Sequence, residues 1–315
     1  MELKRCRIHQ KSWIFLCSIL FGFTSGLRPD LKKEDARPLC ECGSNVKPLQ
    51  TRVVGGKNAA PGDFPYATGL LSSGDEYLGR RIFGLTGFRP YCGGTLVTDR
   101  HVVTAAHCVR ERISGEITLD IGEYDLEDQK QGRTLRNSKS LKLHPKYKAK
   151  TFNSDIALIE LSRPVKLGTK IKAAWLPPQD ADIAPGTPVT VYGWGRLGYN
   201  SGRPKVLQTL QIPLVSRSEC QKKLVSRITP NMLCAGGEEG KDACIGDSGS
   251  GLTAKRGDEN VLVGIVSFGR KCALPGVAGV YTKVSNFVDW IYENTRSSGC
   301  QPCIASLEDF VLDRN

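Results

Sequence analysis

The sequence predicts an all-β protein with one helix near its C-terminus. From residue 53 onward, short runs of β-branched and apolar residues alternate with clusters of Gly, Pro, Asn and Asp, the residues of turns. Examples of these runs are residues 94–97, 156–159, 189–192 and 261–266. The chain has 315 residues, 40% of them hydrophobic, which is enough to bury the core of a large β domain.

The single expected helix begins near Ser285, a residue type that caps helix N-termini well. The small residues 297–299 would end it. Its apolar face would consist of Phe287, Val288, Ile291 and Tyr292.

The N-terminus has the pattern of a secretory signal peptide. Basic residues precede an apolar run at residues 13–23, and small residues at 24–26 follow it, so we expect cleavage near Gly26. An uncleaved anchor is the alternative, but the run is shorter than the roughly 18 to 20 residues that span a bilayer. No other apolar run approaches that length, which excludes a multi-pass membrane protein. The protein is therefore expected to be secreted and extracellular.

Cysteine usage agrees with secretion. Ten of the 12 cysteines follow the expected signal peptide, and an even number in a secreted chain predicts disulfides. Residues 27–52 are rich in charge and proline and too short to fold alone, so we interpret them as a pro-segment, which contains Cys40 and Cys42. Residues 297–315 form a second extension with cysteines.

The chain is basic, with 44 Lys and Arg against 32 Asp and Glu and a net charge of +12. Such an excess favours anionic surfaces but does not by itself name a partner. Polyanions are one open partner class. We expect neither a specific nucleic acid nor a membrane as partner.

Three short motifs carry the candidate catalytic residues. Residues 104–108 contain His107, residues 153–158 contain Asp155, and residues 246–249 contain Ser248. In this order the motifs resemble those of trypsin-like serine proteases of the chymotrypsin family, and the resemblance covers residues 53–296. It implies two antiparallel six-stranded β-barrels with the site in the cleft between them and the helix packed outside.

Each of these residue types suits acyl transfer. The Ser248 hydroxyl is a weak nucleophile that needs a base, and His107 titrates in the useful range. Asp155 would orient the imidazole and stabilise its positive charge without taking the proton. The backbone N–H groups of Gly246 and Ser248 would then donate to the developing oxyanion.

The resemblance also implies a specificity pocket. It places Asp242 at the pocket floor and the small residues Gly269 and Gly279 in the walls, an arrangement that suits a long cation. Ala243 stands where many relatives carry Ser. Because a guanidinium pairs bidentately with a carboxylate and an ammonium would miss the hydroxyl, Arg is expected to be preferred over Lys.

Two more segments take roles from the resemblance. Ser267, Phe268 and Gly269 match the edge strand that pairs with the substrate backbone, with Phe268 in place of the usual Trp. Cleavage between Arg52 and Val53 would free an N-terminus that pairs with Asp247 and assembles the oxyanion hole. Either another protease or the enzyme itself would make this cut.

The resemblance implies three disulfides and leaves four cysteines to be paired. The implied pairs are Cys92–Cys108, Cys220–Cys234 and Cys244–Cys272. Three connectivities exist for the remaining four residues. Cys300 and Cys303 would close a local bridge easily, but this would force a strained one between Cys40 and Cys42. We therefore favour two cross-links between the pro-segment and the C-terminal extension.

Two departures from the family pattern bear on stability and cofactors. Ser250 stands where a glycine is usual, and a positive φ there would cost about 1 kcal/mol. Some relatives hold calcium in the loop that here contains four acidic residues. A charge run is more often a solvated face, so no cofactor is expected and calcium is the open alternative. These acidic residues are Glu123, Asp125, Glu127 and Asp128.

The leading interpretation is thus a secreted serine endopeptidase that is activated from a zymogen and cleaves after Arg. Its expected partners are protein substrates with exposed Arg sites, an activating protease, and protein inhibitors. The alternative is a catalytically weak or polyanion-binding homologue that acts as a binding module, but none of the three triad residues is replaced.

Overall fold

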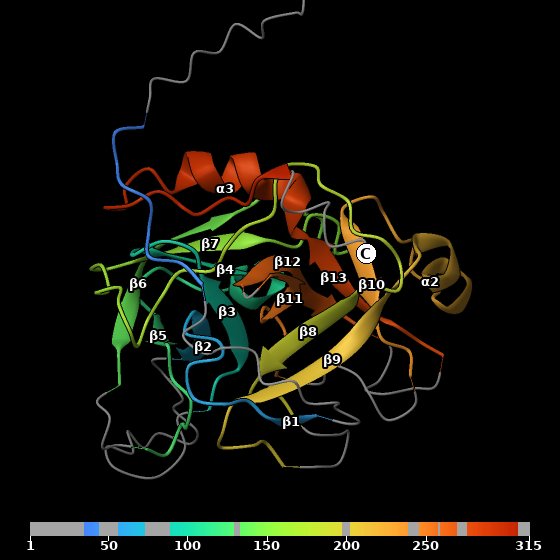
Figure 1. The fold of residues 1–315 in the computed structure, drawn as a ribbon, viewed down its shortest axis with the longest axis horizontal. Helices are drawn as coiled ribbons and strands as arrows, with labels where there is room; N and C mark the ends of the chain where they lie inside the picture. The colour runs from blue at the N-terminus through green and yellow to red at the C-terminus, as the bar shows by residue number, and fades with distance from the viewer. Residues whose placement is uncertain are drawn as a thin grey trace, which may run out of the picture. The chain divides into compact units, whose positions relative to one another are not determined.

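The computed structural model describes residues 35–43, 56–72, 89–128, 133–196, 202–238, 246–257, 259–269 and 276–307. The strands within these ranges build two closed antiparallel barrels, which lie next to each other in Figure 1. Within these ranges no helix combines the length and the apolar character needed to cross a bilayer.

The first barrel has the spatial strand order β2-β3-β4-β7-β6-β5 and closes through the pairing of β2 with β5. Most side chains of its central strands are buried, because branched and apolar residues fill the small interior. The strands are β2 (Ala67–Ser72), β3 (Cys92–Leu96), β4 (His101–Thr104), β5 (Ile117–Ile121), β6 (Leu135–Leu143) and β7 (Ala157–Leu161).

The second barrel closes through the pairing of β8 with β9, and the short strand β1 (Lys57–Asn58) adds to the outer edge of β9. The predicted fold of two six-stranded barrels is therefore confirmed. The barrel strands are β8 (Pro188–Gly193), β9 (Gln208–Val215), β10 (Met232–Ala235), β11 (Gly251–Arg256), β12 (Glu259–Phe268) and β13 (Gly279–Lys283).

The described helices are short: α1 (Ala106–Val109), α2 (Arg217–Lys223), the 3-10 turn η1 (Val284–Phe287) and α3 (Val288–Asn294). The C-terminal helix was predicted, but its Ser285 cap is wrong. Ser285 lies inside η1, where its buried hydroxyl donates to the Ala181 carbonyl over 2.7 Å, and α3 begins later without a side-chain cap. The α-helix therefore starts two residues later than a cap at Ser285 would place it.

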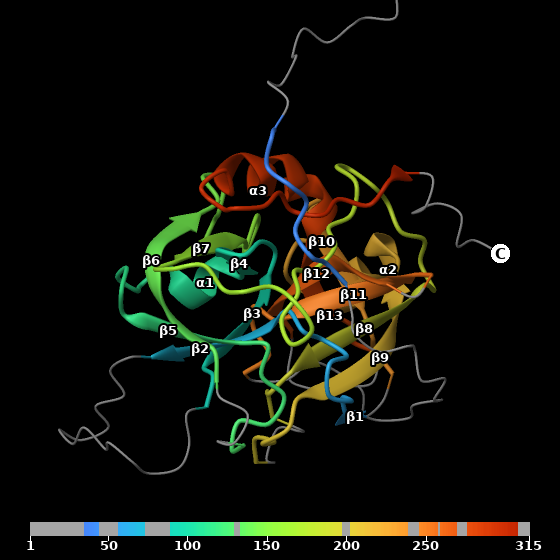
Figure 2. The same ribbon diagram turned by 60° about the vertical axis from the view of Figure 1, so that its left-hand side comes forward.

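Helix α3 packs on the outside of the first barrel (Figures 1 and 2). Phe287 and Ile291 belong to that barrel's hydrophobic core, as the expected apolar face requires. The His144 ring stands edge-on to Trp290 at 5.0 Å between centroids, and Lys142 of β6 donates to the Asn294 side chain over 2.7 Å.

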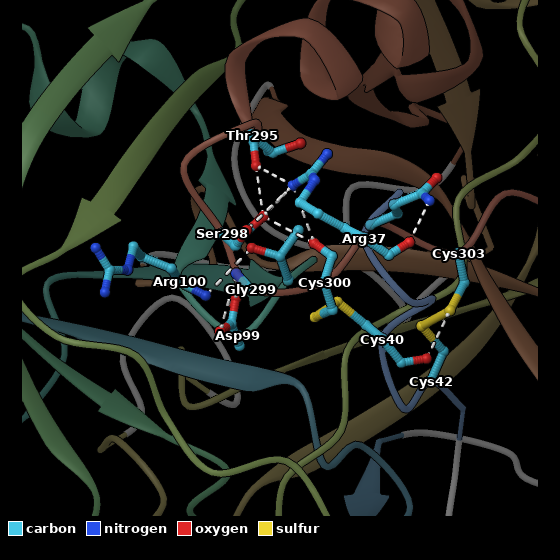
Figure 3. The surroundings of a disulfide bond; sticks show 12 residues. Arg37, Cys40, Cys42, Asp99, Arg100, Thr295, Ser298, Gly299, Cys300 and Cys303 are labelled. Carbon is cyan, nitrogen blue, oxygen red and sulfur yellow. Dashed lines mark hydrogen bonds between the residues drawn. A yellow bond between two sulfur atoms is a disulfide. The ribbon is translucent and has the colours of Figure 1, made fainter. Parts of the chain in front are cut away.

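The two cysteine-bearing extensions are covalently joined. Cys40 bonds Cys300 and Cys42 bonds Cys303, so both favoured cross-links are present (Figure 3). Backbone hydrogen bonds run beside them: the Cys40 amide donates to the Gln301 carbonyl over 2.9 Å, and the Gln301 amide donates to the Pro38 carbonyl over 2.7 Å.

We call the joined segments 37–43 and 300–303 the clasp. Arg37 adds side-chain hydrogen bonds to it. Its guanidinium donates to the Thr295 carbonyl and the Ser298 hydroxyl, each over 2.8 Å, and to the Cys300 carbonyl over 3.2 Å (Figure 3). Thr295 is the C-terminal cap of α3, so the guanidinium lies beyond the C-terminal end of this helix, where the dipole favours a cation. Residues 37–43 are thus held by two disulfides and by hydrogen bonds.

Candidate active site

The barrel strands bring His107 and Asp155 together. His107 lies in α1, directly after β4, and Asp155 lies just before β7; β4 and β7 are paired, with Thr104 opposite Ala157. His107 Nδ1 is 2.7 Å from Asp155 Oδ2, and the His107 amide donates to Asp155 Oδ1 over 2.9 Å. The Asp155 side chain is fully buried, whereas 20% of the His107 side chain is exposed. The carboxylate therefore fixes the ring while leaving part of it accessible.

The Asp155 carboxylate has a further donor. Ser267 on β12 donates its hydroxyl to Asp155 Oδ2 over 2.5 Å, and Thr282 on β13 donates to the Asp155 carbonyl over 2.8 Å. Ser267 was assigned only to the substrate-pairing strand, and no local sequence signal indicates its bond to Asp155. The second barrel thus holds a residue of the first barrel in its orienting position.

Burial is the main cause of a raised pKa at Tyr147, and the negative charge of Asp155 adds to it. The phenol of Tyr147 therefore stays neutral near physiological pH and does not compete with His107 as a proton acceptor.

The turn that carries Ser248 is held between the two barrels. The Gly93 amide of β3 donates to the Ser248 carbonyl over 2.7 Å, and the Gly249 amide donates to the Val266 carbonyl of β12 over 2.8 Å. Gly246 and Gly249 have φ values of 103° and 81°, which favour glycine. A side chain at Gly249 would also collide with the Gly93 carbonyl.

Ser248 and His107 have no mutual hydrogen bond among the described contacts. His107 Nε2 instead lies 3.7 Å from Cys108 Sγ. Catalytic hydrogen bonds often form fully only when substrate is bound, so this geometry is compatible with a proton-accepting role.

The strain expected at Ser250 is absent. Within the described part of the chain, the non-glycine residues with positive φ are Phe152, Ser154 and Asp180. In the Ser248 turn, the residues with positive φ are Gly246 and Gly249, so the backbone of Ser250 is not strained. Its hydroxyl occupies space that Gly93 leaves open by having no side chain.

Asp247 points toward the segment 193–195 of the second barrel. The Gly195 amide donates to Asp247 Oδ1 over 2.8 Å, and side chains at Gly193 or Gly195 would overlap the Asp247 carboxylate. Val53 and Arg52, the other residues of the expected activation site, lie outside the described residues. The geometry of a Val53–Asp247 ion pair is therefore not part of the structure.

Two of the residues expected to line the specificity pocket, Gly269 and Gly279, are described. Asp242 and Ala243 lie outside the described residues, and a side chain at Gly269 would meet no atom of a described residue within 4 Å. Gly279 begins β13, opposite Ala235 of β10. Both positions therefore retain the small residues that a pocket for a long side chain needs.

Phe152 is a residue near the site that the sequence did not indicate. Its ring stands edge-on to His107 at 5.7 Å and lies 5.2 Å from the ring of Phe268. Its φ of 53° is uncommon for a bulky residue. Phe152 and Phe268 together form an apolar surface beside the catalytic histidine.

Two of the implied disulfides, Cys92–Cys108 and Cys220–Cys234, are present, and Cys244–Cys272 lies outside the described residues. The Cys92 and Cys108 sulfurs lie near His107 in a cluster of metal-ligand type, but their mutual bond removes the thiolates that a metal would need. This trio is therefore not a metal centre.

The carboxylates of the acidic loop are partly engaged within the protein. Asp125 accepts the Glu127 amide over 2.9 Å, Glu127 pairs with Lys205 over 2.6 Å, and Glu123 accepts the Tyr124 amide over 2.9 Å. Burial raises the pKa of Glu123. Calcium binding here stays a hypothesis.

Two closed barrels with an oriented His–Asp pair beside a glycine-flanked serine define a serine protease. A family model described as Trypsin matches residues 53–291. The chain is 39% identical to Trypsin II-P29 of Gallus gallus over 246 residues, which cover 77% of this chain and 88% of that protein. It is 38% identical to the anionic trypsin of Bos taurus over 244 residues, with 77% and 89% covered.

Longer relatives match as well. The chain is 36% identical to the Serine protease filzig of Drosophila melanogaster over 263 residues, which cover 81% of this chain but 15% of that protein. The chain belongs to the trypsin family of serine proteases. It is a serine endopeptidase that acts on protein substrates.

Proposed function

We propose that this enzyme is secreted as a zymogen, is activated by cleavage between Arg52 and Val53, and cleaves its substrates after Arg. The observation that carries the proposal is the buried Asp155 carboxylate, which orients His107 beside the Ser248 turn. The four described disulfides are consistent with an extracellular location.

The chain's own residues account for acyl transfer. His107 Nε2 takes the Ser248 proton as Oγ attacks the substrate carbonyl, and Asp155 stabilises the resulting imidazolium through Nδ1. The backbone N–H groups of Gly246 and Ser248 donate to the oxyanion. His107 then gives the proton to the leaving amine, and water attacks the acyl-enzyme by the same route in reverse.

Selectivity for Arg is expected to depend on Asp242. Replacing Asp242 by Ser should lower kcat/KM for an Arg substrate by about 100-fold or more, because the buried guanidinium would lose its charged partner. The parent enzyme should prefer Arg over Lys, since Ala243 offers an ammonium no hydroxyl. The measurement is kcat/KM for matched Arg and Lys substrates. Equal values, or a preference for Phe or Leu, would contradict this proposal.

The clasp predicts that the activated enzyme has two covalently joined chains. After cleavage at Arg52, the disulfides Cys40–Cys300 and Cys42–Cys303 should keep the pro-segment attached. On a gel probed for that segment, it should migrate with the catalytic chain and separate when reductant is added. The double variant Cys40→Ser/Cys42→Ser should release it without reductant. Release from the parent enzyme under non-reducing conditions would exclude the tether.

A further inference from the structure

We propose that two cationic loops beside the cleft bind acidic residues of the substrate on the N-terminal side of the scissile bond. The first loop is the hairpin of residues 146–153, and the second is the segment 222–231, which begins in the last turn of α2. The inference rests on the proposed cleavage after Arg and adds a second determinant of specificity.

The hairpin 146–153 carries uncompensated positive charge. No Asp or Glu occurs between residues 129 and 154. The side chains of Lys146, Lys148 and Lys150 are exposed, and none forms an ion pair with a described residue. The hairpin is closed by the Lys148 amide, which donates to the Asn153 carbonyl over 3.0 Å. The three cations therefore project from one short, ordered turn.

The segment 222–231 adds three more cations. Lys222, Lys223 and Arg227 are exposed and have no ion-pair partner among the described residues, and no acid occurs between residues 220 and 237. Glu219 of α2 precedes Lys222 and Lys223 by three and four residues, so the six cations of the two loops outnumber the neighbouring acid and repel each other. Bound carboxylates would reduce this repulsion.

Hydrogen bonds fix the two loops side by side. Asn153 Oδ1 accepts from the Thr229 hydroxyl over 2.8 Å and from the Asn231 side-chain amide over 3.2 Å. Asn231 in turn accepts from the Asn286 side chain over 2.9 Å. The cationic surface is thus built on the second barrel and reaches the hairpin of the first.

The position of Phe152 ties this surface to the cleft. Phe152 belongs to the hairpin, yet its ring contacts both His107 and Phe268. Phe268 lies in the segment 267–269, which by resemblance pairs with the substrate backbone as an edge strand. We place the third to fifth residues before the cut beside the hairpin, because a chain extended along this segment rises about 3.3 Å per residue.

Because Phe152 joins the cationic hairpin to the cleft, the position of the hairpin distinguishes an acidic peptide from an anionic polysaccharide as the partner. A polysaccharide would need only the positive charge, whereas a peptide that enters the cleft must pass Phe152 before it reaches His107. Lys148 and Lys150 stand within four residues of Phe152 on the hairpin, and Lys146 stands six residues before it. The geometry therefore favours an acidic stretch of the substrate itself.

A preference for acidic residues before the scissile bond also affects whether the enzyme can cut its own activation site. Counted back from the Arg52–Val53 bond, the third to fifth residues are Gln50, Leu49 and Pro48, and Lys47 precedes them. None is acidic, so the enzyme's own activation site lacks the proposed determinant. Activation by a protease of different preference is then favoured over autoactivation.

The test uses the activated enzyme and three fluorogenic Arg peptides that differ only in the third to fifth residues before the bond, which are Glu, Gln or Lys. At low ionic strength we expect kcat/KM to be about 10-fold higher for the Glu peptide than for the Gln peptide, and this advantage to disappear near 1 M salt. The Lys peptide should be the slowest.

Matched variants locate the effect. Lys148→Gln/Lys150→Gln should remove most of the preference for Glu, while kcat/KM for the Gln peptide stays near the parent value. Arg163→Gln/Lys166→Gln removes the same charge beyond the far end of β7 and should keep the preference. As a second readout, Leu49→Glu/Gln50→Glu in the precursor should speed its conversion by active enzyme.

The outcomes separate this inference from the proposed function. Equal kcat/KM for the Glu and Gln peptides, with cleavage after Arg intact, would overturn the inference alone. Tight heparin binding without a preference for Glu would also overturn it and would assign the surface to a polysaccharide. A failure to cleave after Arg in any peptide would overturn the proposed function.

Discussion

Replacing Ser248 by alanine is expected to lower kcat by about six orders of magnitude, because nucleophile and base act as a unit and removing either abolishes acyl transfer. The backbone of the turn should survive, since the Gly93–Ser248 hydrogen bond uses main-chain atoms only. The measurement is hydrolysis of an Arg ester by the activated variant, together with its thermal unfolding midpoint.

A neighbouring hydroxyl supplies the matched control. Ser250 is buried two residues from Ser248, so Ser250→Ala removes the same group from the same turn without touching the nucleophile. This variant should keep activity near the parent level. If Ser248→Ala retained a rate close to that of Ser250→Ala, the assignment of the nucleophile would be wrong.

The sequence predicted those parts of the fold and site that short segments encode. The runs at 156–159, 189–192 and 261–266 became parts of β7, β8 and β12, because branched residues between turn clusters suit a small barrel interior. His107, Asp155 and Ser248 were predicted because each stands in a motif of a few residues. Such motifs identify candidate catalytic residues, but they do not predict which residues from distant parts of the chain contact them.

The contacts that escaped prediction join distant parts of the chain. Ser267 donates to Asp155 across 112 positions, and Phe152 reaches Phe268 only because the two barrels meet. The Ser285 cap failed for the same reason: a tertiary hydrogen bond to residue 181 outweighed the local preference for a cap.

The sequence did not determine how the four remaining cysteines pair with one another. Strain argued against a Cys40–Cys42 bridge, but spacing alone allowed either partner for each cysteine. The structure resolves this through the parallel bridge of Leu39 with Gln301, which sets Cys40 beside Cys300 and leaves Cys42 for Cys303.

The uncut precursor is expected to have at least about 1,000-fold lower kcat/KM than the activated enzyme, because in the proposed activation the oxyanion hole is assembled only when a new N-terminus pairs with Asp247. Arg52→Gln should block cleavage by an Arg- and Lys-specific activating protease, and the precursor should stay inactive. Arg52→Lys is the matched control, since it keeps the cleavage site and should become active. N-terminal sequencing reports cleavage after residue 52, and hydrolysis of an Arg substrate reports the gain of activity.

The same ion pair predicts loss of activity at alkaline pH. The α-amino group of Val53 must be charged to bind Asp247, and pairing raises the pKa of an ammonium above its free value. Its contribution is therefore complete below the unfolded pKa and is lost as the pH rises through the folded pKa. Activity of the cut enzyme should fall in that window and recover when the pH is lowered. An uncut precursor with full activity, or a cut enzyme whose activity stays constant to pH values where amines are neutral, would refute activation through Val53 and Asp247.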